Sequence, residues 1–114
     1  MTPFDLVLVP FPFSDRTAAV KQRPCFVLAS FKPRGLEEHC LVSMVTSRLD
    51  GISFKGDVLV THWKEAGLLK PSLIRLAKLV TMDSTLLRRK LGVVHRADRD
   101  AIGKSLSKIL EAVL

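Results

Sequence analysis

The sequence predicts a β-rich α+β domain in which a series of short strands precedes one C-terminal helix. Apolar runs typical of strands recur along the chain, separated by segments rich in proline, glycine and charge. Near the C-terminus the apolar residues follow a helical spacing, and strands followed by a helix are typical of this fold class. The chain has 114 residues, of which 47% are hydrophobic. Because this supports one core and not two, we expect residues 1–114 to form a single domain.

The first two predicted strands flank a short basic segment. Residues 6–9 (LVLV) are apolar on both faces, which is typical of a buried strand. We expect Pro10 and Pro12 to end or kink this strand, because proline cannot donate a ladder hydrogen bond. Residues 25–29 (CFVLA) are again apolar throughout and directly follow a proline. A mobile cationic loop between the two strands would hold Arg23 at the mouth of the second strand.

The middle of the chain predicts two further strands. Residues 31–38 contain proline, glycine and mixed charges and are expected to form a loop. Residues 39–46 (HCLVSMVT) predict a third strand, which ends before a turn at Asp50-Gly51. Residues 56–61 (GDVLVT) predict a short fourth strand. A brief helical turn should follow, and Gly67 is expected to end it.

The last third of the chain predicts a long strand and two helices. In the strand, residues 71–82, Arg75 and Lys78 interrupt the two apolar faces, as at a barrel edge or an interface. Next, Asp83 or Ser84 can cap a short helix that reaches about Lys90, and Gly92 can end it. We expect the last helix to begin at about Arg96. Along one face it carries the apolar residues Ile102, Leu106, Ile109, Leu110 and Val113.

The charge balance predicts an anionic partner. The chain carries 18 Lys and Arg against 11 Asp and Glu, for a formal net charge of +7. The excess lies mainly in residues 14–34 and 88–104, although charge alone does not choose between RNA, DNA, an acidic protein and a membrane surface. The N-terminal apolar run carries Asp5 and two prolines, unlike a targeting segment. Uncharged runs are far shorter than the roughly 18 residues that span a bilayer, so we expect a cytoplasmic protein without membrane association.

Cysteine and histidine give no metal signature. Cys25 and Cys40 lie in strand-like apolar surroundings without CxxC spacing, so we expect buried, reduced thiols. His39, His62 and His95 are scattered along the chain and form no ligand-spaced motif. We therefore expect neither a metal site nor a cofactor.

Several stretches resemble, in the expected order, the MazF/PemK-like family of endoribonuclease toxins from type II toxin–antitoxin pairs. In the first half these are VLVPFPFSD, KQRPCFVLAS and VTS at residues 45–47; in the second half, GDVLV, WKEAGLLKPSLIRLAKLVTMD and LLRRKLG. The chain departs from the family at two positions. Phe4 precedes Asp5 where the family often has glycine, and Ala77 stands where many members carry an acidic residue.

The resemblance implies both a fold and an activity. The fold would be an SH3-like small antiparallel β-barrel with a C-terminal helix, of the MazF/CcdB type, usually a homodimer. The activity would be sequence-specific, metal-independent cleavage of single-stranded RNA, with a cognate antitoxin as partner. The 2′-hydroxyl of RNA can attack the adjacent phosphate if a protein orients it, stabilises the phosphoryl oxygens and protonates the leaving 5′-oxygen.

The resemblance assigns this chemistry to Arg23 and Thr46. A guanidinium donates two parallel hydrogen bonds to phosphoryl oxygens, and a hydroxyl donates one more. Arginine is effectively always protonated, so Arg23 is not expected to be the general base. Its expected role is to stabilise charge, proton donation by Arg23 stays open, and the general base is unassigned. RNA contacts are expected from Arg16, Lys21, Ser47 and Arg48.

Two other classes of function stay open. One is a barrel that binds nucleic acid without cutting it. The other is a CcdB-like inhibitor of DNA gyrase, because a shared fold does not fix the function. RNA cleavage in the presence of a chelator separates the first from the enzyme, and trapping of gyrase on DNA separates the second.

Overall fold

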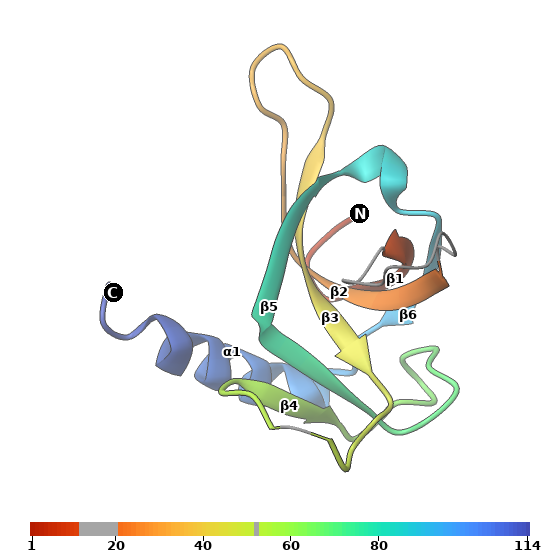
Figure 1. The fold of residues 1–114 in the computed structure, drawn as a ribbon, viewed down its shortest axis with the longest axis vertical. Helices are drawn as coiled ribbons and strands as arrows, with labels where there is room; N and C mark the ends of the chain where they lie inside the picture. The colour runs from red at the N-terminus through yellow and green to blue at the C-terminus, as the bar shows by residue number, and fades with distance from the viewer. Residues whose placement is uncertain (12–20, 52) are drawn as a thin grey trace.

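A computed structural model describes residues 1–11, 21–51 and 53–114. Within these residues the chain forms six strands, one short 3-10 helix and one α-helix (Figure 1). In chain order the elements are β1 (Asp5–Phe11), β2 (Lys21–Phe31), β3 (His39–Thr46), β4 (Asp57–Val60), β5 (Ser72–Asp83), η1 (Ser84–Leu86), β6 (Arg89–Val93) and α1 (Arg96–Leu110).

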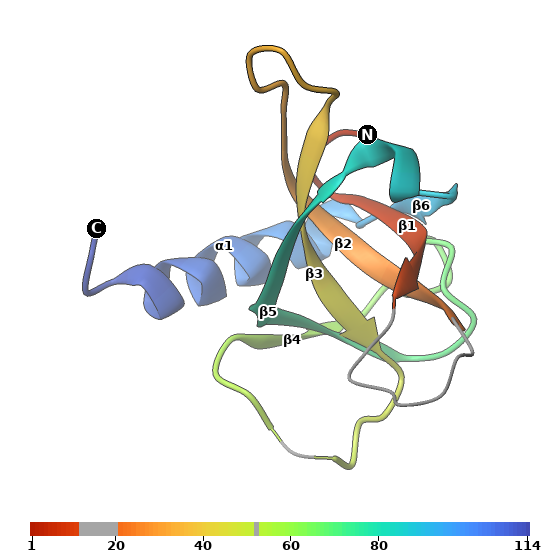
Figure 2. The ribbon, with the colours of Figure 1, turned by 45° about the horizontal axis from the view of Figure 1, so that its top comes forward.

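The strands form one antiparallel sheet in the order β4-β5-β3-β2-β1-β6. The sheet is strongly curled, and β5 bends sharply along its length (Figures 1 and 2). At the bend the β3–β5 register jumps, since Met44 pairs with Arg75 while the preceding Ser43 pairs with Leu79. Helix α1 packs against β4 and β5. The predicted β-rich α+β fold with a C-terminal helix is confirmed, with a sheet that curls into half of a barrel.

Two apolar clusters form the core, and alternate residues of β1 point into each. Leu6 belongs to a larger cluster with residues of β2 to β5 and with Ile102 of α1. Val7 and Val9 belong to a second cluster, which also holds both cysteines. This confirms the prediction that the first apolar run is buried on both faces, and that Cys25 and Cys40 are buried thiols. Burial raises the pKa of Cys25 to about 12, so this thiol stays protonated.

The prediction that Pro10 ends or kinks the first strand is wrong. Strand β1 continues through Pro10, which pairs with Gln22 of β2. Because β6 pairs with β1 only as far as Leu8, the nitrogen of Pro10 is not needed for a second ladder. The expectation for Pro12 falls outside the described residues.

Strand β2 begins at Lys21, earlier than predicted. Arg23 therefore lies within a strand, opposite Val9 of β1, and not on a loop. Pro24 is tolerated there because β3 pairs with β2 only from Cys25 onwards, which leaves one side of this segment without a neighbouring strand.

The predicted helix after β5 is largely wrong. Asp83 does act as a cap, since its Oδ1 accepts a hydrogen bond from the Thr85 N–H at 2.9 Å. Only Ser84–Leu86 are helical, however, and Arg89–Val93 form β6. Pairing between β1 and β6 gives the backbone N–H and C=O groups of both strands hydrogen-bond partners. The stability gained from this pairing outweighs the local helix propensity of residues 89–93.

Helix α1 begins at Arg96, as predicted. The Nδ1 atom of His95 accepts a hydrogen bond from the Ala97 N–H at 3.1 Å and caps the helix. Ile102 is buried, while Val113 lies beyond the helix and is exposed. The predicted apolar stripe is therefore real but shorter than expected. Within the described part of the chain, no helix combines the length and apolar character needed to cross a membrane.

Contacts within the domain explain the two charged residues, Arg75 and Lys78, that interrupt the apolar pattern of β5. Arg75 is buried and lies opposite Asp57 of β4, with 3.7 Å between Nη1 and Oδ2. The guanidinium of Arg75 and the ammonium of Lys78 each lie 4.7 Å from the centroid of the Phe54 ring. Arg75 thus joins β4 to β5 at the bend, while Lys78 stays on the surface.

Candidate functional site

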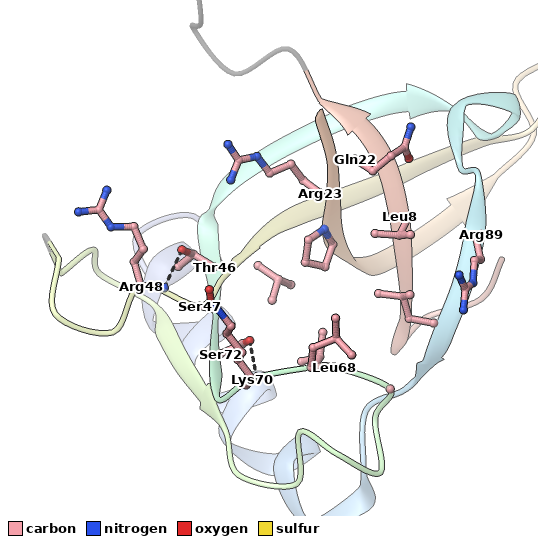
Figure 3. Close-up of a pocket in the computed structure, with 15 residues that line it drawn as sticks. Leu8, Gln22, Arg23, Thr46, Ser47, Arg48, Leu68, Lys70, Ser72 and Arg89 are labelled. Atoms are coloured by element: carbon pink, nitrogen blue, oxygen red, sulfur yellow. Dashed lines mark hydrogen bonds between the residues drawn. The ribbon is translucent and has the colours of Figure 1, made fainter. Parts of the chain in front are cut away.

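A pocket of about 600 Å³ opens where the start of β2 and the end of β3 face the segment between β4 and β5 (Figure 3). Residues of β1, β2, β3, β5, β6 and two connecting segments line it. Its volume lies within the range of about 300–1,000 Å³ that is typical of sites for small organic ligands. The pocket can therefore hold more than a single phosphate group.

All the charged side chains that line the pocket among the described residues are basic. They are Arg23, Arg48, Lys70 and Arg89, and each is exposed. They come from four different segments, so the curl of the sheet brings together charges that are distant in the sequence. Four cations, with no carboxylate among the described lining residues, make a site for a polyanion.

The register between β2 and β3 places Arg23 and Thr46 at the same end of these two strands. The last pair of these strands at this end is Cys25 with Met44. Arg23 lies two residues before Cys25, and Thr46 lies two residues after Met44 on the antiparallel neighbour. Both side chains line the pocket on the same side (Figure 3). The guanidinium and the hydroxyl can thus contact one ligand.

The hydroxyl of Thr46 is held by a local hydrogen bond. Its Oγ1 atom accepts from the backbone N–H of Arg48 at 3.1 Å. Threonine commonly makes this bond to the residue two positions on, and here it fixes the chain where β3 ends. Because the bond uses an acceptor site of the oxygen, the hydroxyl hydrogen can be donated to a ligand.

One wall of the pocket is apolar and is formed mainly by Leu8, Leu68 and Leu91. Its shape depends on close packing between the segment before β5 and the backbone of β6. Gly67 has a φ of +88°, and a Cβ there would overlap the carbonyl oxygen of Leu91. A Cβ on Gly92 would likewise overlap the carbonyl oxygen of Ala66. These glycines allow the two backbones to touch and so set the position of the wall.

The structure brings together most of the residues predicted for the site. Arg23, Thr46, Ser47 and Arg48 all line the pocket. Lys21 is exposed at the start of β2 and is not among the lining residues. The prediction for Arg16 falls outside the described residues. Ala77 is exposed on β5 and does not line the pocket.

Four polar lining residues were not predicted from the sequence: Gln22, Lys70, Ser72 and Arg89. Gln22, Lys70 and Ser72 lie within stretches that resemble the family, but the resemblance assigned no role to them. Arg89 belongs to a basic run that was expected to form a helix, and only its pairing with β1 brings it to the pocket. Within the described residues, no group of three or more His, Cys, Asp or Glu is placed to hold a metal ion.

Comparison with known proteins identifies the fold. The structure of the Mycobacterium tuberculosis toxin MazF-mt6 is 17% identical with a TM-score of 0.69, over 94% of this chain and 96% of that one. An endoribonuclease in complex with its cognate antitoxin, from a mycobacterial species, is 11% identical with a TM-score of 0.73, over 100% and 98%. MazE-MazF from Deinococcus radiodurans is 18% identical with a TM-score of 0.65, over 96% and 94%.

At these identities the solved structures establish the fold alone. A comparison with curated protein sequences finds no match. The model of one family, described as the PemK-like, MazF-like toxin of type II toxin–antitoxin systems, matches residues 2–110. Since that match spans nearly the whole chain, the protein belongs to the PemK-like, MazF-like family of type II toxins.

Proposed function

We propose that the protein is a sequence-specific endoribonuclease toxin that cleaves single-stranded RNA at this pocket. The observation that carries the proposal is that Arg23 and Thr46 line one pocket, in which every charged lining residue among those described is basic. RNA supplies its own nucleophile, so the protein needs only to orient the chain and to stabilise developing charge.

In the proposed reaction the 2′-oxygen forms a bond to phosphorus while the bond to the 5′-oxygen breaks. The products are a 2′,3′-cyclic phosphate and a 5′-hydroxyl. Arg23 donates two hydrogen bonds to the phosphoryl oxygens, and Thr46 donates a third. A proton also has to leave the 2′-hydroxyl, and another has to reach the 5′-oxygen. Because the charged lining residues described here are cations, none of them accepts the first proton.

Partners follow from the same proposal. Two of the similar structures are of complexes, one of an endoribonuclease with its cognate antitoxin and one of MazE with MazF. We expect this toxin to have an antitoxin of its own, with an extended acidic segment that binds across the basic pocket. We also expect a homodimer that acts on mRNA in the cytoplasm, without a metal or other cofactor.

The test is cleavage of a single-stranded RNA by the purified protein in the presence of EDTA. We expect products that end in a 2′,3′-cyclic phosphate. A matched RNA with one 2′-deoxy nucleotide at the cleaved position should stay intact there, because it lacks the attacking oxygen. A strict requirement for added Mg²⁺, or equal cutting of the deoxy substrate, would contradict this mechanism. Binding without cleavage would favour the non-catalytic barrel, and trapping of gyrase on DNA would favour the CcdB-like inhibitor.

A further inference from the structure

The pocket has a basic group at each side and an apolar surface between them. Arg23 and Arg48 lie on one side, and Arg89 lies on the other (Figure 3). Leu8 lies between these groups in the same view, with Leu68 on the wall below. A cation, an apolar surface and a second cation match the order of chemical groups along a nucleic-acid strand, where each nucleoside lies between two phosphates.

The segment before β5 adds an apolar group that the fold does not need. Leu69 lines the pocket, yet its side chain is 93% exposed, so it contributes almost nothing to the core. Next to it, Leu68 is buried and packs in the larger core cluster. Apolar side chains can hold an unstacked base, and an exposed leucine beside a cavity of about 600 Å³ offers such a surface.

We propose that this pocket binds one unstacked nucleotide next to the cleaved phosphate, with its base against Leu69 and its far phosphate on Arg89. This inference rests on the proposed endoribonuclease function. It divides the basic residues into two roles. Arg23 contacts the phosphate that reacts, whereas Arg89 contacts a phosphate that does not change during the reaction.

The division predicts different kinetic effects. A contact that is equally strong in the bound substrate and in the transition state lowers KM without changing kcat. Loss of a charge-assisted hydrogen bond costs enough to raise KM roughly 10- to 100-fold. Arg89→Gln should therefore raise KM by that factor with kcat close to wild type. Arg88→Gln is the matched control, because Arg88 is exposed and adjacent but does not line the pocket, and it should leave both constants unchanged.

A substrate modification identifies the contacted group. In two RNAs, a neutral methylphosphonate replaces the phosphate on the 5′ side or on the 3′ side of the cleaved one. For the wild type, one of these replacements should raise KM about as much as Arg89→Gln does. For Arg89→Gln the same replacement should have little further effect, because two changes that remove one contact are not additive. An abasic nucleotide between the two phosphates should show the same non-additivity with Leu69→Ala.

Binding supplies a second readout that does not depend on cleavage. The dissociation constant is measured for a 2′-deoxy version of each oligonucleotide, which cannot react. Thermal unfolding of Arg89→Gln checks that the variant is folded, and Arg89→Lys is a second variant that keeps the charge. The inference is wrong if each methylphosphonate changes the dissociation constant by the same factor for the wild type and for both Arg89 variants. If the deoxy strands bind as expected but RNA is not cleaved, the subsite stands and the proposed function fails.

Discussion

The guanidinium carbon of Arg99 lies 4.4 Å from the centroid of the Phe4 ring, and Phe4 has a backbone φ of +74°. This left-handed conformation suits glycine, which has no Cβ. In a residue with a Cβ it costs about 1–2 kcal/mol. Two backbone bonds of 2.9 Å, from Phe4 N–H to Val27 and from Val94 N–H to Phe4, hold it in place. The ring also packs edge-on against Phe26, so packing offsets the strain.

The first prediction compares Phe4→Gly with Phe4→Ala. Both variants lose the contacts to Arg99 and Phe26, but only alanine keeps the backbone strain. Phe4→Ala should therefore be less stable than Phe4→Gly by about 1 kcal/mol in urea unfolding, although alanine is usually the more favourable residue. Equal stabilities, or a more stable alanine variant, would show that the left-handed backbone at Phe4 is not strained.

The second prediction concerns Asp98, a buried carboxylate at the start of α1. Its oxygens accept hydrogen bonds from the Thr61 hydroxyl and from the N–H groups of Thr61 and His62. Burial raises the pKa of Asp98, but these bonds and His62 together outweigh it and lower the pKa below its usual value. Asp98→Asn should cost about 1–3 kcal/mol near neutral pH, because charged hydrogen bonds at a buried site are lost.

The sign of this pKa change fixes the pH dependence. A lowered folded-state pKa gives stability that is fully present above the unfolded value of about 4 and is lost as the pH falls through the folded value. The stability gap between wild type and Asp98→Asn should thus be present above about pH 4 and narrow as the pH falls below that value. Asp100→Asn is the control, since Asp100 pairs with Lys104 on the exposed surface and should change stability by less than about 0.5 kcal/mol. A gap that widened in acid would overturn the assignment.

The third prediction uses three glycines with opposite surroundings. A Cβ at Gly67 or Gly92 would overlap backbone of the facing segment, and Gly67 also has a φ of +88°. Gly67→Ala and Gly92→Ala should both be destabilising by more than about 1 kcal/mol and should weaken RNA binding, because they displace the apolar wall of the pocket. Gly103 lies in α1, and a Cβ there meets nothing within 4 Å, so Gly103→Ala should stabilise by up to about 1 kcal/mol. Urea unfolding of the three variants measures these changes in stability.

The strongly apolar strands could be predicted from the sequence because their pattern matches their burial. Residues 39–46 form β3 with the predicted bounds, and the long strand β5 lies within one residue of its predicted limits at each end. Strand β6 could not be predicted this way. Its residues are mostly charged or good helix formers, and they become a strand because β1 has a free backbone edge at that place.

The candidate site depends more heavily on tertiary structure. Arg23 and Thr46 were expected together from the family resemblance, and the β2–β3 register gives the physical reason why both lie at the same end of their strands, where both line the pocket. Arg89 and Lys70 reach the pocket through β6 pairing and through the close contact of Gly67 with β6, neither of which has a local sequence signal. The resemblance alone therefore pointed to one side of the pocket.

The fourth prediction is that the protein is a dimer. Strand β4 pairs with β5 only along Ser72–Arg75, so within the described residues the later part of β5 has a neighbouring strand on one side only. This part carries the exposed side chains of Leu79 and Val80. An open apolar strand edge favours self-association. Sedimentation at micromolar concentration should give about twice the chain mass of 12.7 kDa, and a monomer throughout that range would contradict the prediction.

The last prediction is that Arg23→Lys abolishes most of the RNA cleavage while leaving most of the RNA binding. Lysine keeps the positive charge but has no planar pair of N–H donors, so it cannot hold two phosphoryl oxygens at once. Loss of one donor aimed at developing charge typically costs roughly 100- to 1,000-fold in rate, or about 3–4 kcal/mol. Binding should change little, because Arg48, Lys70 and Arg89 still line the pocket. Arg34→Lys is the control, because Arg34 is exposed and is not among the residues that line the pocket. This variant should cleave and bind RNA like the wild type. Single-turnover cleavage and binding to a 2′-deoxy strand are measured in parallel for both variants. Cleavage by Arg23→Lys at nearly the wild-type rate would make Arg23 a binding residue, and the electrostatic role in the reaction would have to pass to another donor.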